Sequence, residues 1–451
     1  MNTELSTQVK VVLNKLNLSG HRAYIVGGAI RNIIMGLPVH DWDIATDASP
    51  ETVSEVFSGF RVVETGIKHG TVTVIIDRAP IEITTFRAEK GYSDHRRPDE
   101  VLFVNDLTRD LSRRDFTCNA IAYNPDEGIT DPFNGLSDIN NKIIRCVGNS
   151  TERFEEDALR ILRALRFSSV LNFDICIETS KAIHKYYGLL KFISVERIYA
   201  ELRKLVCGDR AAKVLDEYSD VFFFLMPELE AMKGCEQNHI RHIYDVWGHT
   251  LKAVDSVRPV PELRLAMLFH DCGKPCVKST DEKGIDHFYS HSEKSKELAS
   301  DILYRFKASN SERNHICTLV EKHGFEPDII SRKTYRKYIG SYGPEIVKEL
   351  FEVREADFRA QNPVFIESEI KRNEAGLETL NLILGEEPCF SLKDLKINGN
   401  DLLSLGISPT HLLGSVLNRL LEEVMDGRIK NNKADLLKRA EDIYYGNSKT
   451  E

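Results

Sequence analysis

The sequence predicts an α+β fold, in which a small sheet with helices is followed by a long helical part. Two observations support this class. Strand and helix patterns alternate over about the first 147 residues, whereas from Thr151 onward apolar residues recur almost entirely at helical spacing. At 451 residues the chain is also too long for one ordinary hydrophobic core. We therefore expect about two to four domains.

Composition narrows the class of protein. The hydrophobic fraction of 42% and the charged fraction of 29% are typical of a soluble globular protein. No apolar run approaches the roughly 18 residues that a membrane span needs, and the first residues lack the apolar stretch of a signal peptide. We therefore expect a cytoplasmic protein with no membrane partner. The net charge of −9 does not itself indicate nucleic-acid binding, but a local basic surface would suffice for it.

The nine cysteines are scattered and form no CxxC pair. Cys272 and Cys276 lie closest together, and a zinc site there is one interpretation. Matching ligand spacing is missing elsewhere, so reduced and mostly buried thiols are the better interpretation.

The first elements follow one another closely. "AYIVGG" reads as a short strand ending in glycines, and "AIRNIIMGL" as a short helix that Gly36 and Pro38 end. "TVTVIID" and "IEITTF" read as two strands joined through Arg78-Ala79-Pro80 as a hairpin. Further along, "FEEDALRILRALRF" reads as a helix, and "SVERIYAELRKLV" as another with Ser194 as its N-cap.

Asp41 and Asp43 flank Trp42 in "HDWDI". In an extended strand, alternate residues point to the same face, so the two carboxylates would project together. Such a pair is tolerated when a divalent cation lies between it and an anion, and Mg²⁺ favours carboxylates together with substrate phosphates. Gly28 would let the backbone approach a triphosphate, and Arg31 would neutralise its charge. The alternative is a turn with two solvated aspartates.

"GGAIRN…HDWDIATDA" resembles the active-site signature of the bacterial tRNA nucleotidyltransferase and poly(A) polymerase family. Four further blocks match in order: "TTFRAEKGYSDHRRPDEV", "DLSRRDFTCNAIAY", "DPFNGLSDINNKIIRCVG" and "FEEDALRILRALRF". The similarity is dense from about Tyr24 to Phe167 and continues through "SVERIYAEL", "FHDCGKP" and "LKDLKINGNDLLSLGI". One position departs from the family, which usually has an aspartate where this chain has Asn32; we expect Asn32 to support the loop.

The resemblance implies that a 3′-hydroxyl attacks the α-phosphate of a nucleoside triphosphate and that pyrophosphate leaves. Asp41 and Asp43 would hold two Mg²⁺ ions. Glu82 is a candidate third carboxylate, with a solvent-facing strand glutamate as the alternative. Arg113 and Arg114 suit contacts to the triphosphate or ribose, although an ion pair with the following Asp115 is also open for one of them.

Asp157 and Arg160 lie three residues apart in a predicted helix, which makes them neighbours. An intrahelical salt bridge is one interpretation. The resemblance instead implies a protein template for the incoming base, since a carboxylate accepts from the amino groups of cytosine and adenine and a guanidinium donates to their ring nitrogens. Arg163 and Arg166 would then contact the nucleotide or its phosphates.

A second set of residues resembles an HD phosphohydrolase domain, which some members of the bacterial family carry. Its expected metal ligands are His249, His270, Asp271 and Asp357, with His291 and His323 as additions for a second metal. Imidazole and carboxylate groups suit a divalent transition metal; His287 would be structural. These residues leave a second function as an alternative, namely a phosphohydrolase whose head only binds nucleotides. The presence of both Asp41 and Asp43 favours nucleotidyl transfer over this alternative.

We expect the chain to add C, C and A to the 3′ end of tRNA from CTP and ATP, binding the acceptor arm by its shape. The segment from Arg87 to Arg97 is polar and contains glycine, so we expect a mobile loop. In the family a loop of this kind is needed to add the terminal A; an A-adding enzyme and a poly(A) polymerase are the alternatives. The expected domains are a nucleotidyltransferase head (1–147), a helical neck (148–232), an HD body (233–370) and a helical tRNA-binding tail (371–451). The sequence leaves the oligomeric state open.

Overall fold

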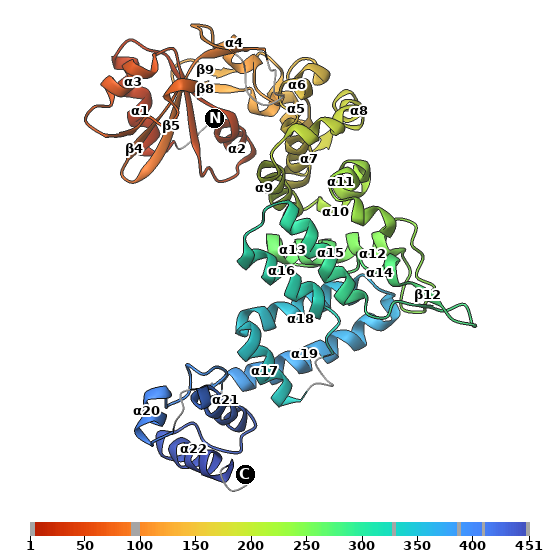
Figure 1. Cartoon of the computed structure of the whole chain (residues 1–451). Helices are drawn as coiled ribbons and strands as arrows, with labels where there is room; N and C mark the ends of the chain where they lie inside the picture. The colour runs from red at the N-terminus through yellow and green to blue at the C-terminus, as the bar shows by residue number, and fades with distance from the viewer. Residues whose placement is uncertain (1–4, 92–99, 327–330, 386–388, 408–410, 448–451) are drawn as a thin grey trace. The chain divides into compact units, whose positions relative to one another are not determined.

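The computed structural model describes residues 5–91, 100–326, 331–385, 389–407 and 411–447 (Figure 1). The chain divides into two compact units, Met1–Pro227 with Arg305–Ala308, and Glu228–Tyr304 with Ser309–Glu451. The first unit contains the sheet, and the second is almost entirely helical. The predicted α+β class is confirmed.

The head is built on a seven-stranded sheet with the order β3-β4-β5-β2-β1-β8-β9. All neighbouring pairs are antiparallel except β2 and β5, which run parallel. The strands are β1 (Ala23–Val26), β2 (Trp42–Thr46), β3 (Arg61–Val63), β4 (Thr71–Ile76), β5 (Ala79–Thr85), β8 (Ala122–Asn124) and β9 (Gly128–Thr130). The helices and 3₁₀ turns of the head are α1 (Thr7–Leu18), α2 (Gly27–Met35), α3 (Pro50–Val56), η1 (Ile67–His69), α4 (Leu107–Ser112), η2 (Thr117–Asn119) and α5 (Gly135–Asn140).

Alternation along the strands gives the sheet a buried face and an open face. Val72 and Val74 on β4 and Ile83 on β5 are fully buried, whereas Glu82, the neighbour of Ile83 on β5, is exposed. Helix α2 begins at Gly27 and ends before Gly36, whose φ of 69° gives a left-handed cap, as the sequence predicts. This strand–helix–strand arrangement brings the start of α2 beside β2, because β1 and β2 pair directly.

Two local predictions differ from the structure. The hairpin between β4 and β5 turns at Asp77 and Arg78, both with positive φ, so β5 already begins at Ala79 and Pro80 lies in the strand. The loop expected from Arg87 is instead a strand at its start, because β6 (Arg87–Lys90) pairs with β7 (Glu100–Phe103). Residues 92–97 of that predicted loop lie outside the described residues.

The helical part of the first unit packs around α7 and α9, which contact each other extensively. Its elements are β10 (Ile143–Ile144), α6 (Ser150–Glu156), α7 (Leu159–Leu171), β11 (Asp174–Ile175), α8 (Ile177–Tyr186), η3 (Tyr187–Phe192), α9 (Val195–Val206), α10 (Ala211–Glu217) and α11 (Ser219–Leu225); the 3₁₀ turn η4 (Pro227–Met232) lies in the second unit from Glu228 onward. Ser194 is the N-cap residue of α9, but its side chain makes no capping hydrogen bond. The single helix expected over "FEEDALRILRALRF" is wrong: Asp157 adopts φ −138° and separates α6 from α7.

The second unit consists of packed helices, with a small hairpin between α14 and α15. Its first elements are α12 (Val246–Ser256), α13 (Pro261–Phe269), α14 (Lys274–Val277), β12 (Ser279–Thr280), β13 (Asp286–His287), α15 (His291–Arg305), α16 (Asn310–Lys322), α17 (Arg332–Tyr342), α18 (Pro344–Arg359) and α19 (Pro363–Gly385). Helix α19 runs without a break across residue 370, where a domain boundary was expected.

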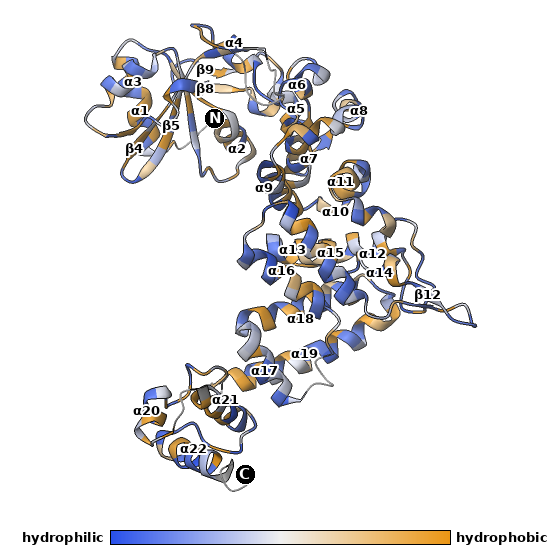
Figure 2. Cartoon of the chain, in the orientation of Figure 1, coloured by the Kyte–Doolittle hydropathy of each residue, from blue (hydrophilic) through white to orange (hydrophobic). Residues whose placement is uncertain are grey.

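The last three helices have a hydrophobic core of their own. They are α20 (Gly399–Ser404), α21 (His411–Met425) and α22 (Lys433–Asn447). Leu402, Leu420 and Leu436, one from each helix, are fully buried in this core, and Figure 2 shows the hydrophobic stretches on α21 and α22. Within the described part of the chain, no helix combines the length and the apolar character needed to cross a membrane.

Candidate functional site

Asp43 lies in the middle of the sheet, in β2. It pairs in register with Val26 on one side and with Glu82 on the other. Asp41 precedes the strand and is exposed, so only Asp43 has the extended position predicted for both. Burial raises the pKa of Asp43, and the charges of Glu82 and Asp41 add to that rise, whereas Arg114 opposes it.

Gly27 allows close approach at this point. It has a φ of +68°, and a Cβ placed on it would lie 3.0 Å from Arg114 Nη1 and 3.1 Å from Asp43 Oδ2. Arg114 is therefore a near neighbour of Asp43, and its other contact is an ion pair with the buried Asp110 at 3.5 Å. The sequence argument took the two glycines after the strand together and named Gly28 as the binding residue, whereas the structure places the close approach at Gly27, where the chain turns from the strand into a helix.

The donor set here suits a hard cation. Asp41, Asp43 and Glu82 offer only carboxylate oxygens, which are the ligands that Mg²⁺ prefers. Among the described residues, these three do not form a group whose ligand atoms all lie within 4.8 Å of one another. A bound cation would have to draw Asp41 and Glu82 toward Asp43.

Arg31 is buried, and its guanidinium is held by two asparagines. Nη1 donates to Asn119 Oδ1 at 2.7 Å and Nη2 donates to Asn32 Oδ1 at 2.8 Å. Asn32 Nδ2 in turn donates to Pro38 O at 3.0 Å. Asn32 therefore braces the loop that leads from α2 to the aspartates, in agreement with its expected role.

Asp115 does not form the ion pair that was considered for it. Its carboxylate binds Arg163 at 2.8 and 2.5 Å. Arg113 instead pairs with Asp110 and Glu89, at 2.9 and 3.1 Å. The sequence could not show this, because the partner of Asp115 is 48 residues away.

Asp157 and Arg160 lie beside the break between α6 and α7. Asp157 Oδ1 accepts from Leu159 N at 3.1 Å, and Oδ2 accepts from Arg197 at 3.1 Å. Arg160 donates to Glu156 at 2.6 Å and to Arg113 O at 2.9 Å. These contacts differ from the intrahelical salt bridge considered above, since Asp157 is extended and not helical.

Three arginines surround the ring of Phe167. Arg166 lies 4.1 Å from its centroid, Arg31 5.0 Å and Arg163 5.4 Å. Arg166 is also paired with Glu201 at 2.6 Å. The aromatic ring and the acidic partners hold these cations close together at the junction of the head and α7.

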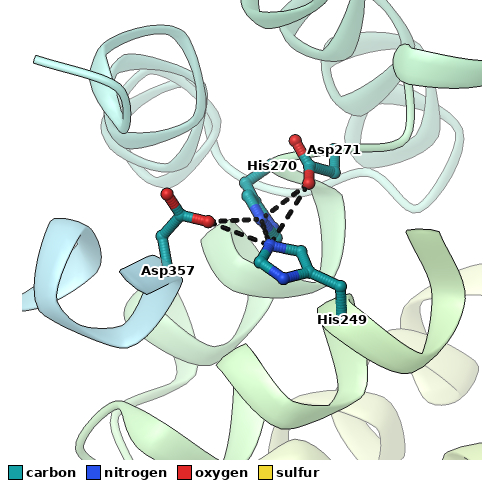
Figure 3. Close-up of side chains that lie close together, drawn as sticks. All are labelled: His249, His270, Asp271 and Asp357. Carbon is teal, nitrogen blue, oxygen red and sulfur yellow. Dashed lines mark hydrogen bonds and ion pairs between the residues drawn. The ribbon is translucent and has the colours of Figure 1, made fainter. Parts of the chain in front are cut away.

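The second unit contains a group of four side chains, shown in Figure 3. His249 comes from α12, His270 and Asp271 follow α13, and Asp357 comes from α18. His249 Nε2 lies 2.9 Å from Asp357 Oδ1 and 3.2 Å from His270 Nε2. His270 Nε2 lies 3.2 Å from Asp271 Oδ2. The four ligand atoms all lie within 4.8 Å of one another, as the sequence predicted for these residues.

Backbone contacts orient both imidazoles toward the centre of this group. His249 Nδ1 lies 3.2 Å from Ala360 O, and His270 Nδ1 lies 2.7 Å from Met267 O. Because a carbonyl oxygen can only accept a hydrogen bond, Nδ1 carries the proton in both rings. Each Nε2 therefore points inward, as it does in metal-binding histidines.

The charges of the group also fit a cation. Burial alone would lower the pKa of His270, yet the adjacent carboxylates raise it to about 10, so without a metal the imidazole carries a proton on Nε2 whose place a bound cation would take. Both oxygens of Asp271 are buried without a well-aligned hydrogen bond, although Lys274 Nζ lies 2.7 Å from Oδ2 as an ion pair. Two nitrogens and two carboxylates converging on one point suit a divalent transition metal.

A second group shares Asp271. Its Oδ1 lies 3.4 Å from His291 Nε2 and 3.8 Å from His323 Nε2. Burial lowers the pKa of His323 to about 4, which keeps it neutral as a ligand must be. His287 is outside both groups and pairs with Asp281 at 3.1 Å.

Three family models match the chain. The model of the poly(A) polymerase head domain matches residues 23–145, and the model of the RNA- and SrmB-binding site of polymerase A matches residues 172–233. A model of domain 2 of tRNA nucleotidyltransferase matches residues 279–440.

Curated relatives extend over almost the whole chain. A CCA-adding enzyme of Ligilactobacillus salivarius is 35% identical over 436 residues, which cover 96% of this chain and 95% of the relative. A CCA-adding enzyme of Staphylococcus aureus is 33% identical over 97% of this chain and 98% of its own length. The solved structure of the Bacillus stearothermophilus CCA-adding enzyme in complex with CTP has a TM-score of 0.74 and 27% identity, covering 99% of this chain and 100% of that one.

Proposed function

The chain belongs to the family of CCA-adding enzymes, and on that premise we propose that Asp41 and Asp43 are the centre of its active site. The enzyme adds C, C and A to the 3′ end of tRNA by nucleotidyl transfer from CTP and ATP, with release of pyrophosphate. The observation that supports this placement is the pairing of Asp43 with Glu82 beside the start of α2.

A divalent metal accompanies nucleotidyl transfer in this family, and we propose Mg²⁺, held by Asp41 and Asp43 with Glu82 as a third ligand. When bound, such an ion stabilises charge on the attacking and leaving oxygens. The missing side chain of Gly27 leaves room for Arg114 and Asp43 at the start of α2, and a helix N-terminus suits the phosphates of a nucleotide. Arg114 supplies positive charge beside Asp43. The chain thus contributes mainly positioning and charge neutralisation.

Nucleotide choice is assigned to Asp157 and Arg160. The carboxylate would accept from the amino group of cytosine or adenine, and the guanidinium would donate to a ring nitrogen. Neither pattern fits uracil or guanine. Both side chains already have partners, Arg197 and Glu156, so an incoming base would exchange those contacts for its own. Arg163 and Arg166 would contact the nucleotide from the face of α7 that also holds Phe167.

The remaining assignments extend the same proposal. The four domains expected from the sequence are a head, a neck, a body and a tail, and the tRNA acceptor arm would bind the neck and tail by its shape and phosphates. Such binding weakens as salt rises. The cytoplasm is the compartment in which tRNA 3′ ends are available to this enzyme.

Substitution of the two aspartates tests the placement. Asp41→Ala and Asp43→Ala should each abolish nucleotide addition in the presence of Mg²⁺ and leave tRNA binding intact, measured by gel extension and by filter binding. Substantial addition by both single variants would place the active site elsewhere.

We propose a second activity for the body, because the two histidine–aspartate groups converge there. His249, His270, Asp271 and Asp357 would hold a divalent transition metal, with His291 and His323 completing a second position on Asp271. Metal-assisted hydrolysis of small phosphoesters is the chemistry that such a centre supports. The resemblance of these residues to an HD phosphohydrolase domain supports the same assignment.

Metal analysis of the full-length chain tests the second activity. The wild-type protein should retain Mn²⁺ or Ni²⁺ after gel filtration and hydrolyse p-nitrophenyl phosphate. The His270→Ala/Asp271→Ala variant should lose both properties while CCA addition stays near the wild-type rate. If the wild-type chain retains no divalent ion, the proposed hydrolytic activity of the body is wrong.

A further inference from the structure

A cavity of about 260 Å³ lies beside the metal-ligand group of the body. Asp357 and His323, one member of each histidine–aspartate group, form part of its wall. Three arginines form another part: Arg241, Arg354 and Arg372. Pockets for drug-sized ligands usually begin at about 300 Å³, so this cavity suits a small ligand or the end of a larger one.

The three arginines converge on one buried carboxylate. Glu369 is 5% exposed, and its oxygens accept from Arg354 Nη2 at 2.6 Å, Arg241 Nη1 at 3.0 Å and Arg372 Nη1 at 3.0 Å. One arginine would be enough to neutralise the charge of Glu369. The chain instead places three guanidinium groups on one side of the cavity, and their hydrogen bonds to Glu369 fix their orientation.

The cavity wall brings three guanidinium groups together. Its other carboxylates are Glu326, which lies 3.6 Å from Arg372, and Asp357. The three guanidinium groups are therefore gathered beside the cavity around the carboxylates of Glu369 and Glu326. Burial alone would raise the pKa of Glu369, but the arginines hold it below its usual value, so this carboxylate stays ionised between them.

The geometry connects this charge to the metal position. Arg354 and Asp357 lie three residues apart on α18 and are therefore neighbours on one helix face. Arg241 is the most accessible of the three, with 42% of its side chain exposed, and its guanidinium lies 5.1 Å from the ring of Phe365. An anion bound at Arg241 would occupy the same cavity that His323 and Asp357 line.

We propose that this cavity, which we call the arginine pocket (Arg241, Arg354 and Arg372 on Glu369), binds the phosphate group of a small phosphoester. Planar guanidinium groups match the oxygens of phosphate in paired hydrogen bonds. The inference rests on the second activity proposed above, whose substrate class and binding residues it names. The alternative is that the arginines only tie α18, α19 and the segment before α12 together.

Arg241 separates the two interpretations, since it is half exposed and its replacement leaves the buried Arg354–Glu369 pair intact. Arg241→Gln removes the charge and keeps a hydrogen-bond donor, and Arg241→Lys keeps the charge. Arg258→Gln is the matched control: Arg258 is 60% exposed, pairs with Glu352 in the same unit and does not line the cavity.

Calorimetric titration of inorganic phosphate into the full-length chain, with and without Mn²⁺, is the direct measurement. Arg241→Gln should weaken phosphate binding about tenfold, equivalent to about 1.4 kcal/mol. Arg241→Lys should recover part of the loss and Arg258→Gln should bind as the wild type does. The Kd for Mn²⁺ should be unchanged in all three. With p-nitrophenyl phosphate, Arg241→Gln should raise KM and leave kcat near its wild-type value.

The outcomes distinguish this inference from the metal centre. If the wild-type chain binds Mn²⁺ but phosphate binds equally well to Arg241→Gln and Arg258→Gln, the arginine pocket is structural and the metal centre stands. If phosphate binds in an Arg241-dependent manner and no metal is retained, the pocket stands and the hydrolytic activity falls. A wild-type chain that binds no phosphate in the millimolar range, with or without Mn²⁺, overturns the proposal.

Discussion

Glu82 lies directly beside Asp43, in register across the parallel pair of β2 and β5. Both side chains therefore leave the sheet on the same face, and the charge of Glu82 disfavours ionisation of Asp43. Burial is the largest cause of the raised pKa of Asp43, and Glu82 is the carboxylate that adds most to the rise, whereas Arg114 opposes it. Like charges are held together in this way where a cation is to be bound, so the pair is the strongest structural reason for placing the metal site here.

Glu82→Gln should reduce the apparent affinity of the head for Mg²⁺ by about 10- to 100-fold, since the carboxylate either contacts the ion or orients Asp43. Excess Mg²⁺ should restore much of the addition rate. The measurement is the rate of CMP addition as a function of Mg²⁺ concentration. Glu55→Gln, at an exposed position on α3 of the same head, is the control. An unchanged Mg²⁺ dependence would make Glu82 a solvent-facing strand residue.

Asp157→Ala and Arg160→Ala should each reduce the preference for CTP and ATP over UTP and GTP. Each variant removes one charged hydrogen-bonding group that would contact the incoming base. Such a loss costs about 1–3 kcal/mol, or roughly 10- to 100-fold in selectivity. The check is kcat/KM for all four nucleotides. Lys213→Ala, an exposed change in α10, should leave the preference intact. Parental selectivity in both variants would rule out the template role.

Asp115→Asn should destabilise the first unit by about 3–5 kcal/mol at pH 7, because it leaves the Arg163 guanidinium without its buried counterion. Arg163 and Asn119 hold the pKa of Asp115 well below its usual value despite burial. The stabilisation is therefore present above the unfolded pKa of about 4 and is lost as pH falls below it. Thermal unfolding of both proteins should show a gap in Tm at pH 7 that narrows below pH 4; a gap independent of pH would contradict the ion pair.

Much of the head could be predicted because its signals are local. The strand before Gly27, the helix that Gly36 ends and the extended segment at Trp42 each depend on residues adjacent in sequence. The sequence also predicted that His249, His270, Asp271 and Asp357 would come together, although they span α12 to α18, because an adjacent His270-Asp271 pair at a helix end is an unusual pattern. Their role as metal ligands stays a prediction.

The remaining features depend on contacts between distant segments. Apolar spacing continues unchanged through Asp157, so periodicity could not show that α6 ends there and that the carboxylate accepts from Leu159 N, at the start of α7. The pairing of Asp115 with Arg163 and the convergence of three arginines on Glu369 join residues on different elements. Charged residues give no pattern from which such partners can be chosen, and only the packing of the helices decides among them.

Full CCA addition is the central claim, and one substrate tests it directly. A tRNA lacking all three terminal nucleotides is offered CTP and ATP together with Mg²⁺, and the products are resolved at single-nucleotide length. The account predicts extension by one CCA followed by a stop. A product that ends at CC, growth only on a tRNA that already carries CC, or a run of added A residues would contradict it.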